Sequence, residues 1–546
     1  MFTRWIATGL VLAMALSALP GRVSAQEIIV EGSDTVIGLH RDELTVKIEE
    51  AILKGCIYLR DNQSRDGSWC PPDDIEGQDR MTGATGVILM GLLYSGVNTD
   101  SPTILRGLNY LARHQEDCNN TYSRGAILCT LALSDPHRKN KLATKLMERQ
   151  ILWLLKAQSN SHEDLWRYGL NSKDHDMSCV QFAVEGLRMA ESVGYQIPHK
   201  PLAKARAAIW KFQHQGGGWA YTKSTKDKVQ KPKLSMTAAT TASLSFLDAA
   251  LSRPREGKVR RDPHIDGGLR ALAKMYSATT QHYNAYSIER AGILTGTRFI
   301  GGHDWYREIA PKMLARQNED GSFHAYHSHV GKHTTALGTG FTLLFLGKGL
   351  APTIVGKLDW GAPSRATAYD MRNLTEAVSR ELGTHLNWIN LPVDAPDEEY
   401  MKVPLIYISG DEDPYDSLIE HKAKFVKYLN AGGTILGTGL DNSKEFEDGY
   451  TKFVKEIQPG AEFERLPLKH YIYDRWHKIR RTYGLYATVS DKGGRPVALL
   501  IKEPFAAPLS TRRGKGVKQS FELGANIILA LTNVDKKRNF LGEAMK

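Results

Sequence analysis

Two aspartates that flank a histidine stand directly before a predicted helix, at Asp174-His175-Asp176. Carboxylic acids held close together in a cavity can transfer protons, so Asp174 and Asp176 are candidate catalytic acid–base residues. Met177 follows, so no further carboxyl group is adjacent to share the proton. An aspartate in this place is also a good N-cap for the next helix, and we favour this second interpretation.

Histidines are crowded together later in the chain, at His324, His327, His329 and His333. Imidazole nitrogens are ligands for zinc and related metals, and His329 and His333 are the candidate metal ligands. A zinc site also needs a further ligand that is fixed in space, and without one these histidines are polar side chains of a solvated loop. The loop is the favoured interpretation, and zinc is the one cofactor that the sequence suggests.

Aromatic side chains could line a binding cavity in the same part of the chain. Trp219, Tyr221, Tyr283 and Tyr286 present flat faces that can stack on a sugar or a prenyl chain, and Trp219 and Tyr283 are candidate ligand-binding residues. Packing between helices explains these residues equally well.

Acidic residues follow two predicted buried strands in the last third of the chain. Asp411 and Asp413 come after VPLIYISG, and Asp441 follows TILGTGL. Ligands of parallel α/β sheets lie beyond the carboxyl ends of the strands, so these three residues are ligand-binding candidates, with His470 as a further one. Exposed acidic residues of loops are more often simply solvated.

Helical repeats must position the aspartates, the histidines and the aromatic residues described above. Variants of Gln63–Trp69 (QSRDGSW) recur at later glutamines, each after an apolar helical run: Gln115, Gln158, Gln213 and Gln317. The starts are 52, 43, 55 and 104 residues apart, and Gly267–Met275 with Asn284–Gly296 fills the long interval as a degenerate unit. A period near 50 residues indicates pairs of helices. We expect each glutamine to cap the end of the preceding helix.

These loops resemble the QxxDGSW repeats of the squalene cyclase and prenyltransferase β-subunit superfamily, from about Asp42 to Pro352. The resemblance implies an α/α toroid of about six helix pairs, whose parallel inner helices point their positive N-termini at one mouth of a central cavity. Such a mouth suits an anionic or polar ligand. Triterpene cyclases carry Asp-x-Asp-Asp near such a helix, and here Met177 stands in the last position. Prenyltransferases bind zinc with Asp, Cys and His side chains. In this chain His333 corresponds to the histidine, and the Asp and Cys ligands have no counterpart.

Beyond Pro352 strands alternate with helices. We predict strands at 353–358, 385–391, 403–409, 433–437 and 462–466, a hairpin of 485–490 with 495–501, and helices at 370–382, 417–430, 446–457 and 521–532. This alternation predicts a mostly parallel, Rossmann-like or flavodoxin-like sheet with helices on both faces. Neither a dinucleotide fingerprint nor a Gly-x-Ser-x-Gly elbow occurs in it.

The segments LNW, PLIYISGDED, FVKYLNAGGTILGTG and LPLKHYIY resemble a bacterial domain of unknown function (number 4159), over nearly all of Thr353–Asn533. That family often follows toroid repeats in exported proteins, and its fold is similar to that of class I glutamine amidotransferases. Where the amidotransferases carry a nucleophilic cysteine, this chain has Thr438 and Leu440. The resemblance therefore implies an architecture rather than an amidase activity.

The first 25 residues have the pattern of a secretory signal peptide: Arg4, an apolar run from Trp5 to Leu19, and Val23-Ser24-Ala25 before the cleavage point. An uncleaved membrane anchor is the alternative. We expect a polar lead over 26–41, the toroid over 42–352, the α/β domain over 353–533 and a polar tail over 534–546. In an oxidising compartment the five cysteines could form one or two disulfides.

The 546 residues carry a net charge of +11. The basic residues are interleaved with acidic ones and form no dense run, so nucleic acid is not an expected partner. The first hypothesis is an exported periplasmic or extracellular protein, not integral to the membrane after cleavage, that binds rather than catalyses. Its toroid cavity would hold a small-molecule, lipid or glycan ligand, and its α/β domain would contact an envelope protein. The alternative is an enzyme acting on a terpenoid, prenyl or polysaccharide substrate through Asp174, Asp176 and His333.

Overall fold

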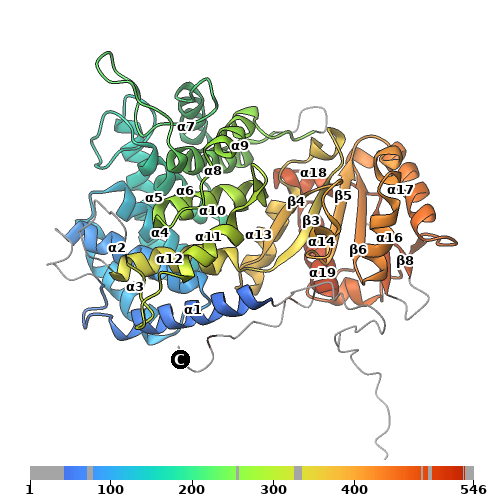
Figure 1. The fold of residues 1–546 in the computed structure, drawn as a ribbon, viewed down its shortest axis with the longest axis horizontal. Helices are drawn as coiled ribbons and strands as arrows, with labels where there is room; N and C mark the ends of the chain where they lie inside the picture. Colours follow the sequence, from blue (N-terminus) through green and yellow to red (C-terminus); the bar gives the residue numbers. More distant parts are fainter. Residues whose placement is uncertain are drawn as a thin grey trace, which may run out of the picture.

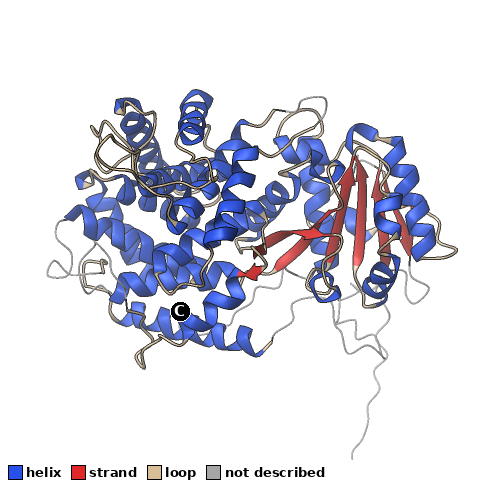
Figure 2. Cartoon of the chain, turned by 45° about the horizontal axis from the view of Figure 1, so that its top comes forward, coloured by secondary structure: helices blue, strands red, loops and turns tan. Residues whose placement is uncertain are grey.

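The protein is described by a computed structural model that covers residues 42–69, 78–253, 258–324, 335–480, 484–489, 495–532, 534 and 541. A helical part and a part built on a sheet lie side by side along the long axis (Figures 1 and 2). The predicted fold class, an α/α toroid followed by an α/β domain, is confirmed. The change expected at residue 352 falls between the last toroid helix and the first strand of the sheet.

The toroid consists, in the described part of the chain, of six inner and six outer helices. The inner helices are α2 (Gln78–Tyr94), α4 (Thr121–Ser134), α6 (Met177–Ser192), α8 (Leu234–Leu251), α10 (His282–Thr295) and α12 (Thr335–Gly349). The outer helices are α1 (Glu43–Asp61), α3 (Pro102–His114), α5 (Lys141–Asn160), α7 (His199–Lys211), α9 (Pro263–Met275) and α11 (Trp305–Leu314), with a short hairpin of β1 (Phe299–Ile300) and β2 (His303–Asp304) before α11. Each inner helix packs against the next, and α12 packs against α2, so the ring is closed.

The repeated glutamines join neighbouring repeats, which corrects the expectation that they cap the preceding helix. Gln63 Nε2 donates to Gly67 O in its own loop and to Thr103 O in the next outer helix, both at 3.0 Å. Gln158 and Gln213 make the same pair of bonds, because a side-chain amide has two hydrogens to donate. Gln317 Nε2 donates to Ala51 O in α1 at 2.8 Å and thereby links the last repeat to the first.

The loop aromatics bond back to the outer helix that precedes them. The indole nitrogens of Trp69, Trp166 and Trp219 donate to backbone oxygens at 2.7, 2.8 and 2.9 Å, and all three side chains are buried. Trp219, a candidate ligand-binding residue, is thus held inside the packing between helices.

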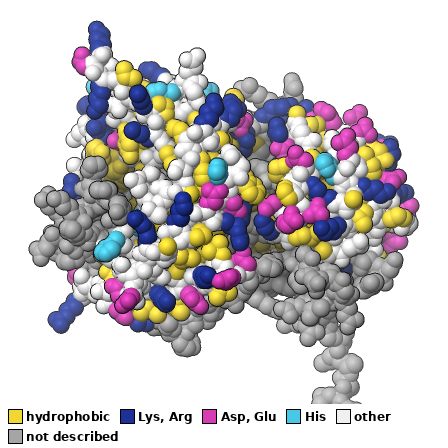
Figure 3. Space-filling view, viewed as in Figure 1, with side chains coloured by type: hydrophobic (Ala, Val, Ile, Leu, Met, Phe, Trp, Pro, Cys, Tyr) yellow, Lys and Arg dark blue, Asp and Glu magenta, His cyan; other side chains and the backbone are white. Residues whose placement is uncertain are grey.

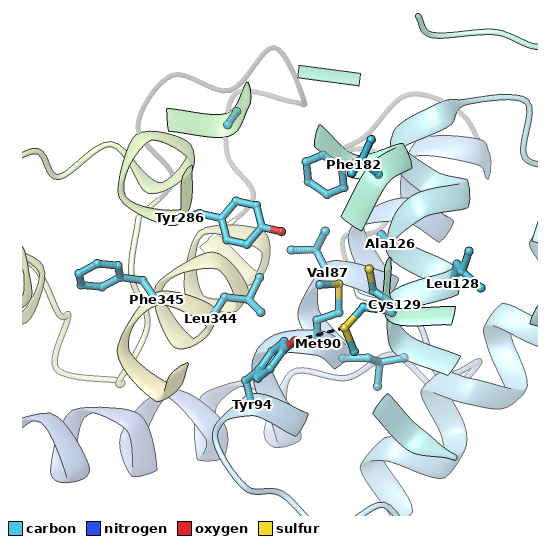
Figure 4. Packing of buried hydrophobic residues seen from close by; sticks show 14 of the residues in the cluster. Val87, Met90, Tyr94, Ala126, Leu128, Cys129, Phe182, Tyr286, Leu344 and Phe345 are labelled. Carbon is cyan, nitrogen blue, oxygen red and sulfur yellow. Dashed lines mark hydrogen bonds between the residues drawn. The ribbon is translucent and has the colours of Figure 1, made fainter. Parts of the chain in front are cut away.

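Side chains meet across the ring interior, which was expected to be a central cavity. The Tyr283 hydroxyl on α10 donates to Gln181 Oε1 on α6 at 2.7 Å, although α8 separates these helices in the ring. Further along the axis, the Tyr94 hydroxyl on α2 contacts the sulfur of Met189 on α6 at 3.9 Å. Figure 4 shows the side chains of Tyr94, Phe182 and Tyr286 converging from different helices. Side chains therefore cross the ring interior from the Tyr283–Gln181 bond to the Tyr94–Met189 contact.

A buried network of charges continues this interior toward the α/β domain. Arg290 bonds to Glu289 at 2.5 Å and to Glu185 across the ring at 3.2 Å. Arg188, one turn after Glu185, pairs with Glu376 of the α/β domain. Burial by itself would raise the pKa of Glu376, but the surrounding arginines hold it well below its usual range. These charges fix the α/β domain against the C-terminal ends of the inner helices.

The α/β domain contains a seven-stranded mixed sheet in the order β4-β3-β5-β6-β9-β8-β7, counted over the described residues. The first five strands of this order are parallel; β8 is antiparallel to β9, and β7 is antiparallel to β8. The strands are β3 (Thr353–Asp359), β4 (Asn387–Pro392), β5 (Leu405–Gly410), β6 (Thr434–Gly439), β7 (Glu464–Arg465), β8 (Leu485–Val489) and β9 (Pro496–Ile501). The predicted mostly parallel sheet is therefore confirmed.

Helices cover both faces of this sheet (Figure 1). They are α13 (Asp370–Leu382), α14 (Asp397–Tyr400), α15 (Tyr415–Ile419), α16 (Lys422–Asn430), α17 (Lys444–Ile457), α18 (Ala506–Thr511) and α19 (Val517–Thr532). The predicted single helix over 417–430 is two helices, α15 and α16, with a break at Glu420 and His421. Among the described residues there is no helix that is both long and apolar enough to cross a bilayer.

The sequence left one or two disulfides possible, and the described cysteines form none among themselves. Cys56, Cys118, Cys129 and Cys179 are each buried and unpaired among the described residues. Burial raises the pKa of Cys56 to about 12, so its thiol stays protonated and behaves as a small apolar side chain. Cys70 lies outside the described residues.

We predict that Gly217→Ala destabilises the ring more than Gly96→Ala does. Both glycines have positive φ, +89° and +93°, where a side chain costs about 1–2 kcal/mol. A Cβ at Gly217 would also lie 2.3 Å from Gly267 O, whereas one at Gly96 would meet nothing within 4 Å. Thermal unfolding of both variants measures the difference, and equal decreases in midpoint would contradict close packing of the repeat loop.

We also predict that Lys348 makes stability depend on pH. Burial, followed by the charge of Arg290, lowers the pKa of its amine to about 7. In the unfolded chain the amine keeps its proton up to about pH 10, so between about pH 7 and pH 10 the unfolded state binds more protons and the free energy of unfolding rises with pH. The thermal midpoint of Lys348→Met should rise less over this range than that of the unmodified protein, while exposed Lys47→Met should follow the unmodified protein. An unchanged slope in Lys348→Met would contradict the prediction.

Candidate functional site

Asp176 lies at the mouth of the ring, at the N-terminus of the inner helix α6. Its Oδ1 accepts hydrogen bonds from the Ser178 backbone N–H, at 3.0 Å, and from the Ser178 hydroxyl, so the predicted N-cap is confirmed. Its Oδ2 is contacted by the Tyr168 hydroxyl at 3.4 Å, and the residue is 5% exposed. The helix N-terminus stabilises the negative charge of this carboxylate. The arrangement makes Asp176 a fixed hydrogen-bond acceptor, and a catalytic role stays a prediction.

Three tyrosines lie around the start of α6, where this carboxylate is fixed. Tyr168 and Tyr221 are 44% and 39% exposed, and the Met177 backbone N–H donates to Tyr221 O at 2.9 Å. The Tyr122 hydroxyl donates to Ser178 Oγ at 2.5 Å. Burial, and then the charge of Asp176, raises the pKa of Tyr168 to about 12, so its hydroxyl is a donor at neutral pH. We call Tyr122, Tyr168, Asp176, Ser178 and Tyr221 the mouth cluster.

One turn deeper, Gln181 connects the mouth cluster to the ring interior. Its Oε1 accepts from the Tyr283 and Ser287 hydroxyls at 2.7 and 3.3 Å. Its buried Nε2 has no hydrogen-bond partner among the described residues, and the same holds for the buried Tyr286 hydroxyl. An unpaired buried polar group costs about 1–3 kcal/mol, so a ligand that accepts or donates a hydrogen bond here would relieve that cost.

The three side chains of Asp174-His175-Asp176 have three different sets of partners. Asp174 pairs with Arg167 and is half exposed. His175 is buried, and its Nδ1 lies 2.5 Å from Glu163 Oε2. Burial lowers the pKa of His175, so its ring is neutral at neutral pH. With Asp174 bound to Arg167 and Asp176 to Ser178, the predicted acid–base residues do not form a carboxyl pair.

His175 also lines a cavity of about 210 Å³. The other residues around this cavity come from the end of α7 and the loop after it: Lys211, Phe212, Gln213, His214, Ala220, Thr222, Lys223 and Ser224. The cavity therefore lies between two neighbouring repeats, beside the mouth cluster.

The predicted metal ligands His329 and His333 lie outside the described residues, as does His327. His324 is described and is exposed. Among the described residues no group of three or more histidine, cysteine, aspartate or glutamate side chains is placed to hold a metal. The zinc site stays a prediction.

The acidic candidates of the α/β domain lie at the carboxyl edge of the sheet. The ends of β5 and β6 are adjacent, with Gly410 opposite Gly439, so Asp411 and Asp441 follow neighbouring strands as expected. Asp411 pairs with Lys258 of the toroid, whereas Asp413 Oδ1 accepts from the Tyr415 backbone N–H at 2.8 Å. Asp441 is exposed and has a positive φ of 49°. A ligand at these residues stays a prediction, as it does for half-buried His470.

Sequence reasoning missed a buried ion pair at the same edge. Lys357 Nζ in β3 lies 2.6 Å from Asp370 Oδ1 at the start of α13 and 2.9 Å from Thr367 Oγ1. Burial lowers the pKa of this lysine. The sequence feature that could have indicated this ion pair is a lysine within an apolar strand, TIVGKLDW. The pair lies where the strand order reverses, because β4 is on one side of β3 and β5 on the other, and sheets of this kind bind ligands there.

The connection between α8 and α9 of the toroid covers the edge of the sheet beside this ion pair. The Val259 backbone N–H donates to Ala366 O at 2.6 Å, and the Ala368 N–H donates to Val259 O at 2.8 Å. Together with the pair of Lys258 and Asp411, these bonds hold the connection between α8 and α9 over the carboxyl edge. The carboxyl edge at the strand reversal is thus covered by a segment of the toroid.

Comparisons with known proteins give one family match and distantly similar solved structures, and none assigns an activity to this chain. The solved structures similar to the chain include the type II terpene cyclase MstE from Scytonema, 11% identical with a TM-score of 0.35 over 56% of this chain and 99% of that one. They also include the GH76A α-1,6-mannanase from Salegentibacter sp. HEL1_6, 8% identical with a TM-score of 0.41 over 56% of this chain and 99% of that one. The search of curated proteins found no match. Residues 350–527 match a domain of unknown function (DUF4159), as expected from the sequence, and the likeness to amidotransferases stays a prediction.

Proposed function

We propose that the protein is exported and binds, without catalysis, a glycan at the mouth cluster. The observation that carries the proposal is the exposed phenol of Tyr168, whose hydroxyl contacts the fixed carboxylate of Asp176, together with exposed Tyr221, whose backbone oxygen is bound at the start of α6. A sugar has apolar C–H faces that stack on phenol rings and a rim of hydroxyls that donate to carboxylates. Tyrosine suits such a ligand because it combines an apolar ring with a polar hydroxyl.

The polarity of the site favours a sugar over a prenyl chain. A hydrocarbon would desolvate the carboxylate of Asp176 without offering it a hydrogen bond, and would leave the amide of Gln181 unpaired. A polyol offers donors and acceptors to both groups. The cross-ring bond between Tyr283 and Gln181 also leaves the interior below the mouth spanned by side chains, so a ligand would bind near the mouth.

The signal peptide expected over residues 1–25 supports export to the periplasm or the cell exterior, where envelope glycans occur. A contact with an envelope protein is part of the proposal, and the α/β domain offers a surface for it. Leu468, Tyr471 and Trp476 are all exposed within one short segment, and clustered exposed apolar side chains mark interaction surfaces. On the face shown in Figure 3 the described basic and acidic side chains are interspersed, which does not favour nucleic acid.

The alternative function is an enzyme that acts on a terpenoid, prenyl or polysaccharide substrate, with Asp174 and Asp176 as acid–base residues. Asp176 Oδ1 accepts two hydrogen bonds from Ser178 and Asp174 pairs with Arg167, so the two carboxyl groups are not brought together at one point where they could share a proton. Binding without catalysis is therefore the function that the geometry supports better.

Calorimetric titration of the purified protein with a panel of envelope-type oligosaccharides tests the proposal. We expect at least one oligosaccharide to bind and Tyr168→Ala to weaken that binding by about tenfold, the equivalent of roughly 1.4 kcal/mol. Asp176→Asn should also weaken binding, and since asparagine is a good N-cap residue the helix should be retained.

Tyr471→Ala removes an equally exposed tyrosine from the α/β domain and serves as the matched control, with no expected effect on sugar binding. Binding that is unaffected by Tyr168→Ala, or no binding by any oligosaccharide, would refute the glycan proposal. Turnover of an oligosaccharide or a prenyl substrate that is lost in Asp176→Asn would establish the enzyme instead.

A further inference from the structure

A cavity of about 270 Å³ lies between the toroid and the edge of the sheet, far along the chain from the mouth cluster. The toroid contributes Arg298 and Phe299 from the β1 hairpin, and the α/β domain contributes the end of β4 and the loop into α14, residues 389–399. This volume is near the lower end of the range for small-ligand pockets. The site is separate from the one proposed for the glycan.

The cavity has an apolar body and two charged side chains with unused hydrogen-bonding atoms. Ile389, Leu391 and Ala395 supply apolar walls, and Phe299 is partly exposed beside them. Arg298 Nε and Glu399 Oε2 are both buried, and neither has a hydrogen-bond partner among the described residues. Glu399 is 7% exposed, so solvent does not readily reach its carboxylate. Buried charged groups are normally paired, and these two atoms are not.

One other atom of each side chain is already bonded, which fixes its position. Arg298 Nη2 donates to Asp304 Oδ2 at 2.7 Å, and Glu399 Oε1 pairs with Lys402. Each side chain is therefore held by one bond while a donor, Arg298 Nε, and an acceptor, Glu399 Oε2, remain available to a ligand. A site that is fixed before binding loses little freedom when the ligand arrives.

The walls of the cavity are also joined to each other. The Asn390 backbone N–H donates to Gly296 O, and the Asn390 side-chain amide donates to Thr295 O, both at 2.8 Å. Trp388 packs against Gly296, where a Cβ would lie 2.7 Å from the indole ring. These contacts hold the edge strand β4 against the end of α10, so the two sides of the cavity keep a constant separation.

We propose that this cavity binds an α-amino-acid unit with an apolar side chain, either as a free amino acid or within a peptide. Such a unit presents a carbonyl or carboxylate oxygen to Arg298 Nε and an ammonium or amide N–H to Glu399 Oε2, with the apolar side chain against Leu391 and Phe299. Pockets of this kind gain affinity from their apolar walls and specificity from a few placed polar groups.

Titration of the purified protein with three probes tests the proposal: free leucine, N-acetyl-leucine methylamide and N-acetylglycine methylamide. We expect one of the leucine compounds to bind and the glycine compound, which lacks the apolar side chain, to bind at least about tenfold more weakly. Tighter binding of free leucine assigns the site to amino acids, and tighter binding of the blocked compound assigns it to peptides. No binding of either leucine compound would overturn the proposal.

Glu399→Gln keeps the size of the side chain and should weaken leucine binding by about tenfold. Glu398→Gln changes the exposed neighbouring acid and serves as the matched control, with no expected effect. Phe299→Ala provides a second test at a partly exposed position where the fold should be retained, and it should also weaken binding. Binding that is unchanged in both Glu399→Gln and Phe299→Ala would show that leucine binds elsewhere and would overturn the assignment.

Discussion

Glu376 joins the two parts of the protein, and the arrangement of everything else depends on that junction. Its carboxylate is bound by Arg188 of the toroid, by Arg372 one turn before it in α13, and by Arg512 just after α18. Loss of the carboxylate would leave Arg372 and Arg512 without their acidic partner and would leave Arg188 with Glu185 alone, which is costly at a buried site. The α/β domain is therefore held against one end of the ring, and the cavity lined by Arg298 and Glu399, which lies between the two parts, depends on that arrangement.

The junction gives the ring two unlike ends. At the C-terminal ends of the inner helices, Arg372 donates to Ser245 O, Asn387 to Lys348 O and Arg380 to Ser192 O, so backbone oxygens there are bound by the α/β domain. The N-terminal ends carry Asp176 and its phenols instead. Helix polarity suits both arrangements, because cations are favoured at the one end and a carboxylate at the other.

The parts of this structure that could be predicted are those determined by neighbours in sequence. The helix at 370–382 and the cap at Asp176 depend on local periodicity and on a hydrogen bond that spans two residues. The role of Gln63 could not be predicted, because its partner Thr103 is 40 residues away. The bond from Tyr283 to Gln181, which spans 102 residues, likewise depends on how the whole ring closes. Lys357 was visible as a charge within an apolar strand, but its partner Asp370 follows only from how α13 packs on the sheet.

The bond from Gln317 to Ala51 restricts how the number of repeats can change during evolution. In an open array of repeats, a unit can be gained or lost because each repeat touches only its neighbours. Here the last repeat also touches the first, so the angle between successive helix pairs is tied to their number. A chain with one repeat more or fewer would need a different packing angle between every two successive helix pairs. Sequence changes are therefore more readily accepted in the loops than in the number of repeats.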